Sequence, residues 1–384
     1  MRHLFLLDNN VIFLNHGSFG ACPQPVFAAY QTWQRRLEAQ PVKFLGRDLW
    51  GYLAEAREVL GDYLNTAAAN LVFVPNATFG VNVVARSLTL GPGAEVLATD
   101  HEYGACDRTW QFLAQKRGFA YVRQPVPLDK MTAADLLEAV WAGVTPRTKL
   151  IFVSHISSAT AVTFPVAAIC ARAREAGILT LIDGAHAPGQ IGLDVTAVDA
   201  DFYTGNCHKW LCAPKGAAFL YARPSAQAML EPLVVSWGWG AERPYTTGSD
   251  FVDYLIWQGT DDPAAYLSVP HAIQFQAAHD WPRQQERCHA LLRQALAELE
   301  TITGCASPYP DADAYRQMAI VPLPRLSDLN QLKERLYTEY QIEIPCLAWN
   351  GRYFVRISVQ AYNNASDLQR LTTALTQLVP LLLA

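Results

Sequence analysis

One lysine lies in a setting that suggests chemistry. Lys209 occurs in TGNCHKWLCAPKG (residues 204–216), between His208 and Trp210 and just after an apolar run. These neighbours are not typical of a charged surface helix. Either the side chain reaches solvent from a half-buried loop, or its amine is held in a site for chemistry. Desolvation lowers the pKa of an amine and makes it a usable nucleophile.

Other polar side chains follow apolar runs in the same part of the chain. They are Asn76-Ala77-Thr78 after LVFVP (71–75), His101 after EVLATD (95–100), and Asp183 and His186 after ILTLI (178–182). Ligands of open parallel sheets bind at the carboxyl ends of strands, where these side chains would converge. A hydroxyl at a helix start suits a phosphate group. Each residue alone also has a structural explanation, as a helix cap, a packed ring or an ion-pair partner.

One cofactor requires all of these groups together. Pyridoxal 5′-phosphate (PLP) needs a lysine to hold its aldehyde as a Schiff base, a phosphate site, a flat group against the ring and a carboxylate at the pyridine nitrogen. Asp183 fits the last role, because its charge favours the protonated nitrogen. A metal site of Asp183, His186 and His208 is the alternative, but it lacks typical metal-ligand spacing and leaves Lys209 without a role. Dinucleotide, P-loop and GxSxG fingerprints are absent.

The composition restricts the class of protein. The chain has 384 residues, of which 51% are hydrophobic and 17% charged, and its net charge is −5. These values indicate a well-buried enzyme of about two domains. No basic block suggests a nucleic-acid partner, and no stretch resembles a membrane span or a signal peptide. We therefore expect free thiols at the eight cysteines and a cytoplasmic protein.

Strand and helix patterns alternate between residues 71 and 222. Short apolar runs predict strands at 71–75, 95–100, 149–155, 178–183, 201–205 and 216–222. Helical patterns are found at 78–90, 103–116, 133–142 and 165–176, and two more helices are expected in 23–65. The alternation predicts an α/β fold with a mostly parallel sheet covered by helices.

The pattern changes after about residue 262. A long helical pattern at 267–300, with Pro282 as a candidate break, precedes strands at 315–322, 341–345 and 352–359. A helix is expected at 327–340 and a closing helix after Ser366 and Asp367. We therefore predict an N-terminal segment (1–22) at the mouth of the active site, a large domain (23–262) and a smaller C-terminal α+β domain (263–384).

Several segments together resemble a known family. They are FLNHGSFG (13–20), NATFGVN (76–82), DHEYGA (100–105), LIDGAHAPG (181–189), GNCHKWLCAPKG (205–216), WQGTDDP (257–263) and NGRYFVRISVQAYN (350–363). Through them the chain resembles fold-type I PLP enzymes and, among these, the class V aminotransferase superfamily and its isopenicillin N epimerase-like branch. The resemblance covers nearly the whole chain and implies a seven-stranded sheet in the large domain.

The resemblance implies roles for individual residues. Lys209 matches the Schiff-base lysine, Asp183 the partner of the pyridine nitrogen, and His101 the residue stacked on the ring. His186 resembles the partner of the ring hydroxyl. The residues similar to phosphate contacts are Ala77, Thr78, Asn206 and His208.

Further matches concern the substrate and a second subunit. Arg356, in VRIS, matches the arginine that binds the substrate carboxylate, as a bidentate pair would. Asn15 and His16 match the segment at the active-site mouth. Gly259 and Thr260 resemble a loop that reaches the phosphate of the neighbouring subunit, which implies a homodimer.

The resemblance leaves the reaction open. It implies PLP chemistry at the α-carbon of an amino acid or an amino-acid-derived substrate, as in an epimerase or an aminotransferase. The alternative is a C–S β-lyase acting on a cysteine derivative. A non-catalytic protein of the same fold is a third hypothesis, which Lys209, Asp183 and Arg356 disfavour. Cys346 is interpreted as a small apolar residue rather than a desulfurase cysteine, and Arg47 either binds a second carboxylate or has a structural role.

Overall fold

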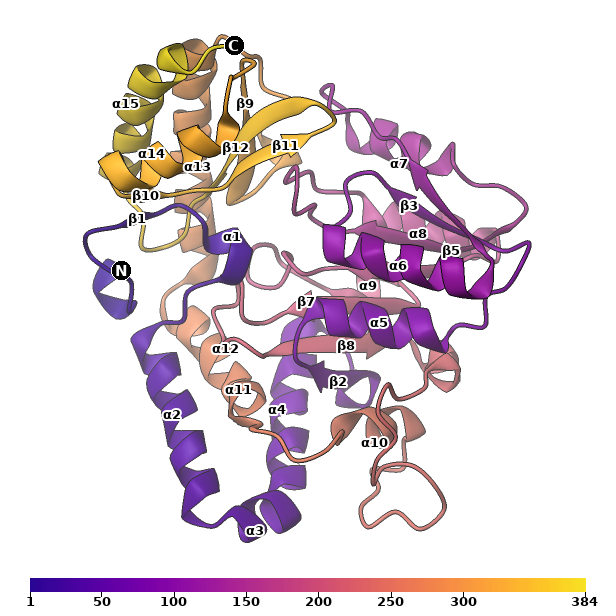
Figure 1. Cartoon of the computed structure of the whole chain (residues 1–384). Coiled ribbons are helices and arrows are strands. Elements are labelled where there is room, and N and C mark those ends of the chain that lie inside the picture. Colours follow the sequence, from indigo (N-terminus) through magenta and orange to yellow (C-terminus); the bar gives the residue numbers. More distant parts are fainter.

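A seven-stranded sheet forms the centre of the protein, as the computed structural model of residues 1–384 shows (Figure 1). Its strands are β2 (Leu71–Val74), β3 (Glu95–Thr99), β4 (Ala120–Gln124), β5 (Thr148–Ser154), β6 (Leu179–Asp183), β7 (Phe202–Asn206) and β8 (Ala218–Ala222). Their order is β2-β8-β7-β6-β5-β3-β4, and only β8 runs against its neighbours. The carboxyl ends of all the others therefore meet at one edge. The predicted α/β fold with a mostly parallel seven-stranded sheet is confirmed.

The apolar runs did not predict strand β4. Its residues AYVRQ are all exposed or half-buried, because β4 lies at the edge of the sheet and pairs only with β3. Edge strands often carry charged and polar side chains, so their apolar pattern is weak.

The two faces of the sheet bury alternate residues of each strand. In β5, for example, Leu150 and Phe152 pack into one core and Ile151 and Val153 into the other. The first core is closed by α5 (Ala77–Ser87), α6 (Gly104–Arg117) and α10 (Asp250–Ile256). The second is closed by α4 (Leu49–Leu64), α7 (Ala133–Trp141) and α8 (Val166–Glu175). Helices thus cover both faces, as the alternating pattern predicted.

Further helices complete this part of the molecule. They are α1 (His16–Phe19), α2 (Gln24–Ala39), α3 (Pro41–Lys43), α9 (Val195–Val198), α11 (Ala264–Leu267) and α12 (Val269–Ala278). A π-helical turn over Phe44–Asp48 joins α3 to α4. None of the helices combines the length and the apolar character needed to cross a bilayer.

The C-terminal part is built on a three-stranded antiparallel sheet, β11 (Cys346–Trp349), β12 (Arg352–Ser358) and β9 (Met318–Leu323), in that order. Three helices pack with it, α13 (Trp281–Thr303), α14 (Leu329–Tyr340) and α15 (Ala365–Leu381). A small parallel pair, β1 (Ile12–Phe13) with β10 (Ile342–Glu343), ties the N-terminal segment to this part.

The single helix expected at 267–300 is in fact interrupted. Helix α12 ends at Ala278, and Asp280 has a positive φ of 47°, which breaks the helical path. Pro282 is the second residue of α13, where its missing N–H costs nothing. The interruption therefore lies just before Pro282, and the proline starts the new helix.

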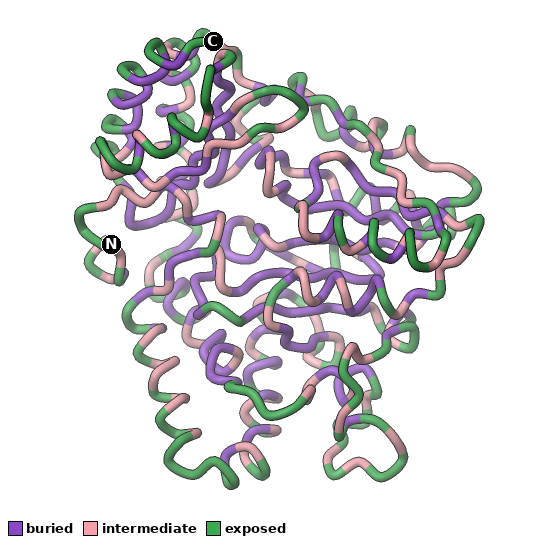
Figure 2. Tube along the Cα trace, viewed as in Figure 1, coloured by how far each residue is buried: buried purple, intermediate pink, exposed green.

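Buried residues run continuously through the molecule (Figure 2). One hydrophobic cluster contains side chains from both sides of residue 262, including Tyr203, Leu292 and Ile357. The division into domains at residue 262 stays a prediction.

Candidate active site

Seven of the predicted residues line one cavity of about 490 Å³ at the carboxyl edge of the sheet. They are Ala77, Thr78, Asp183, His186, Asn206, His208 and Lys209. They follow β2, β6 and β7, whose parallel directions bring their carboxyl ends together. Polar side chains distant in sequence thus meet at the position where α/β sheets bind ligands.

Lys209 is half-buried and lines this cavity. Its Nζ lies 3.1 Å from Nε2 of His186. Burial lowers the pKa of Lys209 to about 8, with the charge of Arg356 acting in the same direction and that of Asp183 against it. About a tenth of the amine is therefore neutral at pH 7, far more than for an ordinary lysine, and the neutral form is the nucleophile.

His186 faces the amine with a defined ring orientation. Its Nδ1 accepts a hydrogen bond of 3.2 Å from Nε1 of Trp210. Burial lowers the pKa of His186 well below its usual value, and the charge of Lys209 acts in the same direction. A neutral ring whose Nδ1 accepts carries its proton on Nε2, so Lys209 Nζ is the acceptor of this contact.

Asp183 ends β6 and is almost fully buried. The N–H of Ala185 donates to Oδ1 at 2.9 Å, and Sγ of Cys106 donates to Oδ2 at 3.7 Å. Burial raises the pKa of Asp183, although the Ala185 N–H and the charge of Lys209 oppose the shift. One backbone N–H and one weakly donating thiol are its only hydrogen-bond donors, so a cationic group in the cavity would stabilise the carboxylate.

The N-terminus of α5 also borders the cavity. Oδ1 of Asn206 accepts the N–H of Ala77 at 2.8 Å, and Asn76 caps the helix by accepting the N–H of Phe79 at 2.9 Å. The first N–H groups of a helix have no intrahelical acceptor, which leaves that of Thr78 with its hydroxyl for an anion. His208 also lines this cavity, and its Nδ1 is 3.0 Å from the carbonyl of Ala217.

Arg356 approaches the cavity from β12, in the C-terminal part. Its guanidinium donates to the carbonyl and the hydroxyl of Ser158 and, at 3.0 Å, to Oγ of Ser18, and both serines line the cavity. Burial lowers the pKa of Arg356 to about 10, so it remains a cation at neutral pH.

His101 does not line the cavity. Its Nδ1 lies 2.7 Å from Oγ1 of Thr160 and its Nε2 lies 2.7 Å from the carbonyl of Val126, and the ring packs on Trp349. The aromatic residue of DHEYGA that does line the cavity is Tyr103, which is 47% exposed. The motif thus contributes an aromatic side chain two residues after the histidine.

Asn15 and His16 lie behind the cavity wall. Nε2 of His16 is 3.0 Å from the carbonyl of Lys209, and its Nδ1 is 3.0 Å from the hydroxyl of Tyr362. Asn15 accepts from Oγ of Ser18 and donates to Glu343 at 2.9 Å. His16 therefore contacts the main chain of Lys209, and Asn15 contacts Ser18, which accepts a hydrogen bond from Arg356.

The remaining predicted residues lie elsewhere. Gly259 and Thr260 line a separate hollow of about 230 Å³ with Trp257, away from Lys209 of the same chain. Arg47 is exposed in the π-helical turn. Cys346 begins β11, and burial raises the pKa of its thiol to about 12, as expected of an unreactive cysteine.

Sequence patterns missed several residues of the cavity. Ser18, Phe19, Tyr103, Ser154 and Ser158 also line it. Ser154 ends β5, so its position after an apolar run was a usable signal. Ser18 and Phe19 fall within FLNHGSFG, but nothing local to that segment predicts the contact of Ser18 with Arg356, which is 338 residues away.

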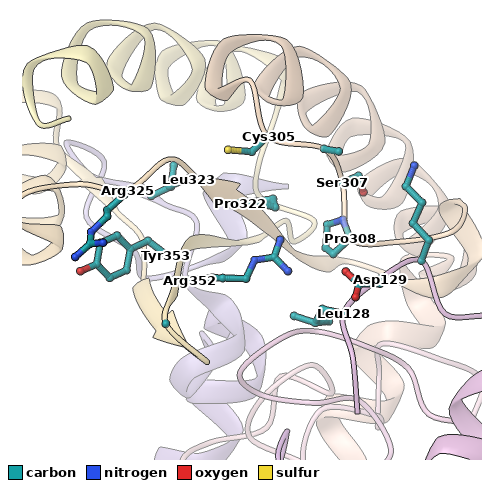
Figure 3. Close-up of a pocket in the computed structure, with 13 residues that line it drawn as sticks. Leu128, Asp129, Cys305, Ser307, Pro308, Pro322, Leu323, Arg325, Arg352 and Tyr353 are labelled. Atoms are coloured by element: carbon teal, nitrogen blue, oxygen red, sulfur yellow. The ribbon is translucent and has the colours of Figure 1, made fainter. Parts of the chain in front are cut away.

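A larger cavity of about 770 Å³ lies between the loop of Leu128 and the C-terminal sheet (Figure 3). Asp129, Arg325 and Arg352 border it, and all three are exposed. It contains none of the predicted residues. No group of three or more His, Cys, Asp or Glu side chains is arranged to hold a metal ion.

Known proteins match the chain over nearly its full length. The family model for class V aminotransferases matches residues 12–371. Isopenicillin N epimerase of Amycolatopsis lactamdurans is 35% identical, with 98% of this chain and 97% of that protein covered, and the Streptomyces clavuligerus enzyme is 33% identical over the same shares. An L-cysteine desulfhydrase of Arabidopsis thaliana is 26% identical, with 97% and 88% covered.

Solved structures share the fold. The cystine C–S lyase C-DES, in complex with cysteine persulfide, superposes with a TM-score of 0.82 at 21% identity, covering 96% of this chain and 98% of that one. The Escherichia coli cysteine desulfurase CsdA gives a TM-score of 0.80 at 22% identity, covering 100% and 98%. With the family model and the epimerases matching almost end to end, the chain belongs to the class V aminotransferase family, whose members are PLP-dependent enzymes of fold type I.

Proposed function

We propose that the protein uses PLP to activate the α-carbon of an amino acid or an amino-acid-derived substrate, and that it acts as an epimerase or aminotransferase of the isopenicillin N epimerase type. One observation carries the proposal: the amine of Lys209, with its lowered pKa, lies in one cavity with Asp183 and the helix start at Thr78. A carboxylate, an amine and an anion site in this arrangement suit PLP.

Different residues of the cavity would bind different parts of the cofactor. Thr78, Asn206 and His208 would bind its phosphate at the α5 N-terminus, Asp183 would pair with the ring nitrogen, and His186 would pair with the ring hydroxyl. When bound, PLP withdraws electrons from the substrate's α-carbon and acidifies its proton. Lys209 moves that proton, because its lowered pKa lets it act as a base near neutral pH.

Tyr103 is a better candidate than His101 for the residue that covers the ring. Tyr103 lines the cavity with a partly exposed aromatic side chain, whereas both ring nitrogens of His101 already have partners outside it. We assign His101 a structural role in holding the loop that presents Tyr103.

Arg356 is positioned to bind the substrate carboxylate. Ser18 and Ser158 hold its guanidinium from both sides, and no carboxylate of the protein pairs with it. A buried arginine without an anionic partner is expected to gain one when substrate binds. Asn15 orients Ser18 in this arrangement, and His16 fixes the main chain of Lys209.

The active unit is proposed to be a homodimer, with Gly259 and Thr260 reaching the phosphate of the other subunit. An apolar hollow of about 480 Å³ next to Thr260 supports this, since exposed aromatic surface of this kind marks an interface. Trp237 in this hollow is 68% exposed. All eight cysteines are free, which supports a cytoplasmic location.

A C–S β-lyase is the second candidate. It is favoured by the match to an L-cysteine desulfhydrase over 97% of this chain. The same residues would serve, because elimination of a β-substituent also begins with removal of the α-proton. Cys346 would take no part, since its thiol is held protonated.

The test starts with the visible absorption of the purified protein after addition of PLP. Wild type is expected to show a band of bound cofactor that Lys209→Ala loses and that Lys149→Ala, an exposed lysine on β5, retains. Incubation with amino acids in deuterated water then separates the reactions. Deuterium at the α-carbon with inversion indicates an epimerase, a keto acid with aminated cofactor an aminotransferase, and pyruvate with ammonia a lyase. A wild type that never acquires the band contradicts the proposal.

A further inference from the structure

Glu102 is a buried carboxyl group at the Asp183 end of the cavity, and none of the roles above uses it. Glu102 is only 7% exposed to solvent. Oε1 is 2.6 Å from Oγ1 of Thr99, and Oε2 is 2.6 Å from Oγ of Ser154. Ser154 lines the cavity and pairs in register with Asp183 at the ends of β5 and β6. Glu102 therefore contacts the cavity through a single hydroxyl group.

No positive charge compensates Glu102. The titratable groups that face it are Asp183, Cys106 and Tyr121, none of them a cation. Tyr121 donates to Asp107, whose charge is paired with Arg123 at 3.3 Å. An isolated carboxylate is costly to bury and takes up a proton instead. Burial raises the pKa of Glu102 to about 8, and the charge of Asp183 acts in the same direction.

Glu95, the first residue of β3, provides a contrast to Glu102, which lies just after the end of that strand. It is also buried, at the opposite end of β3, but Arg147 pairs with it at 2.5 Å and Thr145 donates to it. A glutamate with a cation partner can remain ionised in the interior. Of these two buried glutamates, Glu102, which is the one next to the cavity, has no cation partner.

The charge of Glu102 decides the direction of its bond to Ser154. An ionised carboxylate only accepts, so the Ser154 O–H must point at it, away from the cavity. A protonated carboxyl has an O–H of its own, and a 2.6 Å contact is normal for donation in either direction. If Glu102 donates to Oγ of Ser154, the serine O–H becomes free to donate into the cavity.

We propose that Glu102 is a positioning residue that, as a neutral carboxylic acid, donates to Ser154 and turns the Ser154 hydroxyl toward the cofactor beside Asp183. Loss of the Glu102 proton reverses this hydrogen bond and adds a second negative charge behind Asp183. Both changes alter the electrostatic environment at the ring end of the cavity. This inference rests on the proposed function for the identity of the cofactor, but the charge state of Glu102 does not depend on it.

The first measurement is thermal unfolding of Glu102→Gln and wild type with PLP present. The contribution of Glu102 to stability is complete below its ordinary pKa of 4.5 and declines as the pH rises toward about 8, because the folded state resists ionisation. Glutamine keeps the size and cannot ionise. The Tm advantage of Glu102→Gln over wild type should therefore be larger by at least ~2 °C at alkaline than at acidic pH. Glu95→Gln, which breaks an ion pair, should show no such gain.

The second measurement follows the absorption band of the bound cofactor as a function of pH. Wild type should show a spectral step near the pH at which Glu102 loses its proton, and Glu102→Gln should lose it, because an amide N–H₂ donates to Ser154 at every pH. Ser154→Ala should also lose the spectral step. In the double variant, Glu102→Gln should cause no further change in the spectrum beyond that of Ser154→Ala. Glu95→Gln should keep the wild-type step.

The outcomes separate the two proposals. An unchanged step in Glu102→Gln, or additive effects of the two substitutions, overturns the relay through Ser154. A Tm advantage that is independent of pH shows that Glu102 is ionised in the folded protein and also overturns it. A wild type without any visible band contradicts the proposed function, while the unfolding comparison still reports on Glu102.

Discussion

The amine of Lys209 is controlled by neighbours that act on its charge. His186 presents its Nε2 at 3.1 Å while Trp210 holds the other nitrogen, and the cation of Arg356 disfavours a second positive charge. These contacts and burial all favour the neutral amine, which is the form that reacts with a carbonyl group. The site thus prepares the lysine before any ligand is bound.

The rate of PLP capture by cofactor-free protein should follow this pKa. A lysine with a pKa of about 8 is mostly neutral above that pH, so the rate should rise from neutral pH and level off near it. An unperturbed lysine would continue to gain up to about pH 10.4. Stopped-flow absorption at several pH values measures the rate. A profile that still rises above pH 10 would show that burial does not lower the pKa.

Replacing Asp183 with asparagine should affect stability and cofactor binding in opposite directions. The folded-state pKa of Asp183 is raised, so its contribution to stability is lost as the pH rises above the ordinary value of 3.8. Asp183→Asn should therefore raise the Tm of cofactor-free protein at neutral pH. It should weaken PLP binding by about 10- to 100-fold, the effect of losing a charged hydrogen bond.

Asp201→Asn is the matched control for this prediction. Asp201 is equally buried but is ion-paired with Arg223, at the opposite end of the sheet from the cavity. Its replacement should lower the Tm and leave PLP affinity unchanged. If Asp183→Asn also lowers the Tm of the cofactor-free protein, its carboxylate is better compensated than its contacts indicate. Differential scanning fluorimetry and PLP titration give both quantities.

The sequence could place some residues of the site but not others, for a physical reason. Lys209, Asp183 and Thr78 follow apolar runs, and the ends of parallel strands must meet. Ser18 and Ser158 reach the site through tertiary contacts with Arg356, which no local pattern encodes. The family resemblance implied that His101 stacks on the ring, whereas the residue of this loop that lines the cavity is Tyr103.

At the scale of elements, the N-terminal segment packs tightly on the Lys209 loop. Gly20 ends α1 with a φ of +71°, and a Cβ there would lie 2.0 Å from the carbonyl oxygen of His208. Only glycine allows both this backbone conformation and this approach. The contact fixes the loop together with the hydrogen bond from His16 to the carbonyl of Lys209.

Gly20→Ala should therefore displace the Lys209 loop. The positive φ alone costs about 1–3 kcal/mol, and the contact with His208 adds to this. We expect a lower Tm and weaker PLP binding, measured by calorimetry and by absorption. Gly91→Ala is the control, because a Cβ there meets nothing within 4 Å and its change should be within about 0.5 kcal/mol. If Gly20→Ala and Gly91→Ala change the Tm and PLP binding equally, then the backbone of Gly20 does not approach the carbonyl of His208 closely.

The elements that the sequence predicted are those with a strong burial pattern. The six strands read from apolar runs are buried almost throughout, whereas β4 and β11 are partly exposed along their length. Strand pairing, rather than composition, forms these two. The break between α12 and α13 depends on the positive φ of Asp280, a conformation that its residue type does not require.

At the scale of the whole molecule, the site needs both parts of the chain. Lys209 and Asp183 belong to the large sheet, whereas Arg356 belongs to the C-terminal sheet and is held by Ser158 of the large part. Relative movement of the two parts would change the distance between Arg356 and Lys209. The shared hydrophobic core limits such movement.

The molecule also exposes an apolar surface that a second copy could cover. Val42, Trp50, Trp237 and Tyr245 border the hollow next to Thr260. Trp237 and Val42 are 68% and 74% exposed, although hydrophobic side chains of this size are usually buried. If this surface forms the interface of the proposed homodimer, Trp237→Asp should shift that dimer to monomer in light-scattering measurements, because a charge in an apolar interface is costly.

A subunit-mixing experiment tests whether Gly259 and Thr260 serve the other subunit. Lys209→Ala alone and the double variant Gly259→Val/Thr260→Val alone should each be nearly inactive. If the loop acts across the interface, a mixed dimer contains one site with wild-type Lys209 and a wild-type loop. An equal mixture after subunit exchange should then regain about a quarter of wild-type activity, because half of the dimers are mixed and each has one working site. If the loop acts within its own chain, both sites of every mixed dimer are defective and no activity returns.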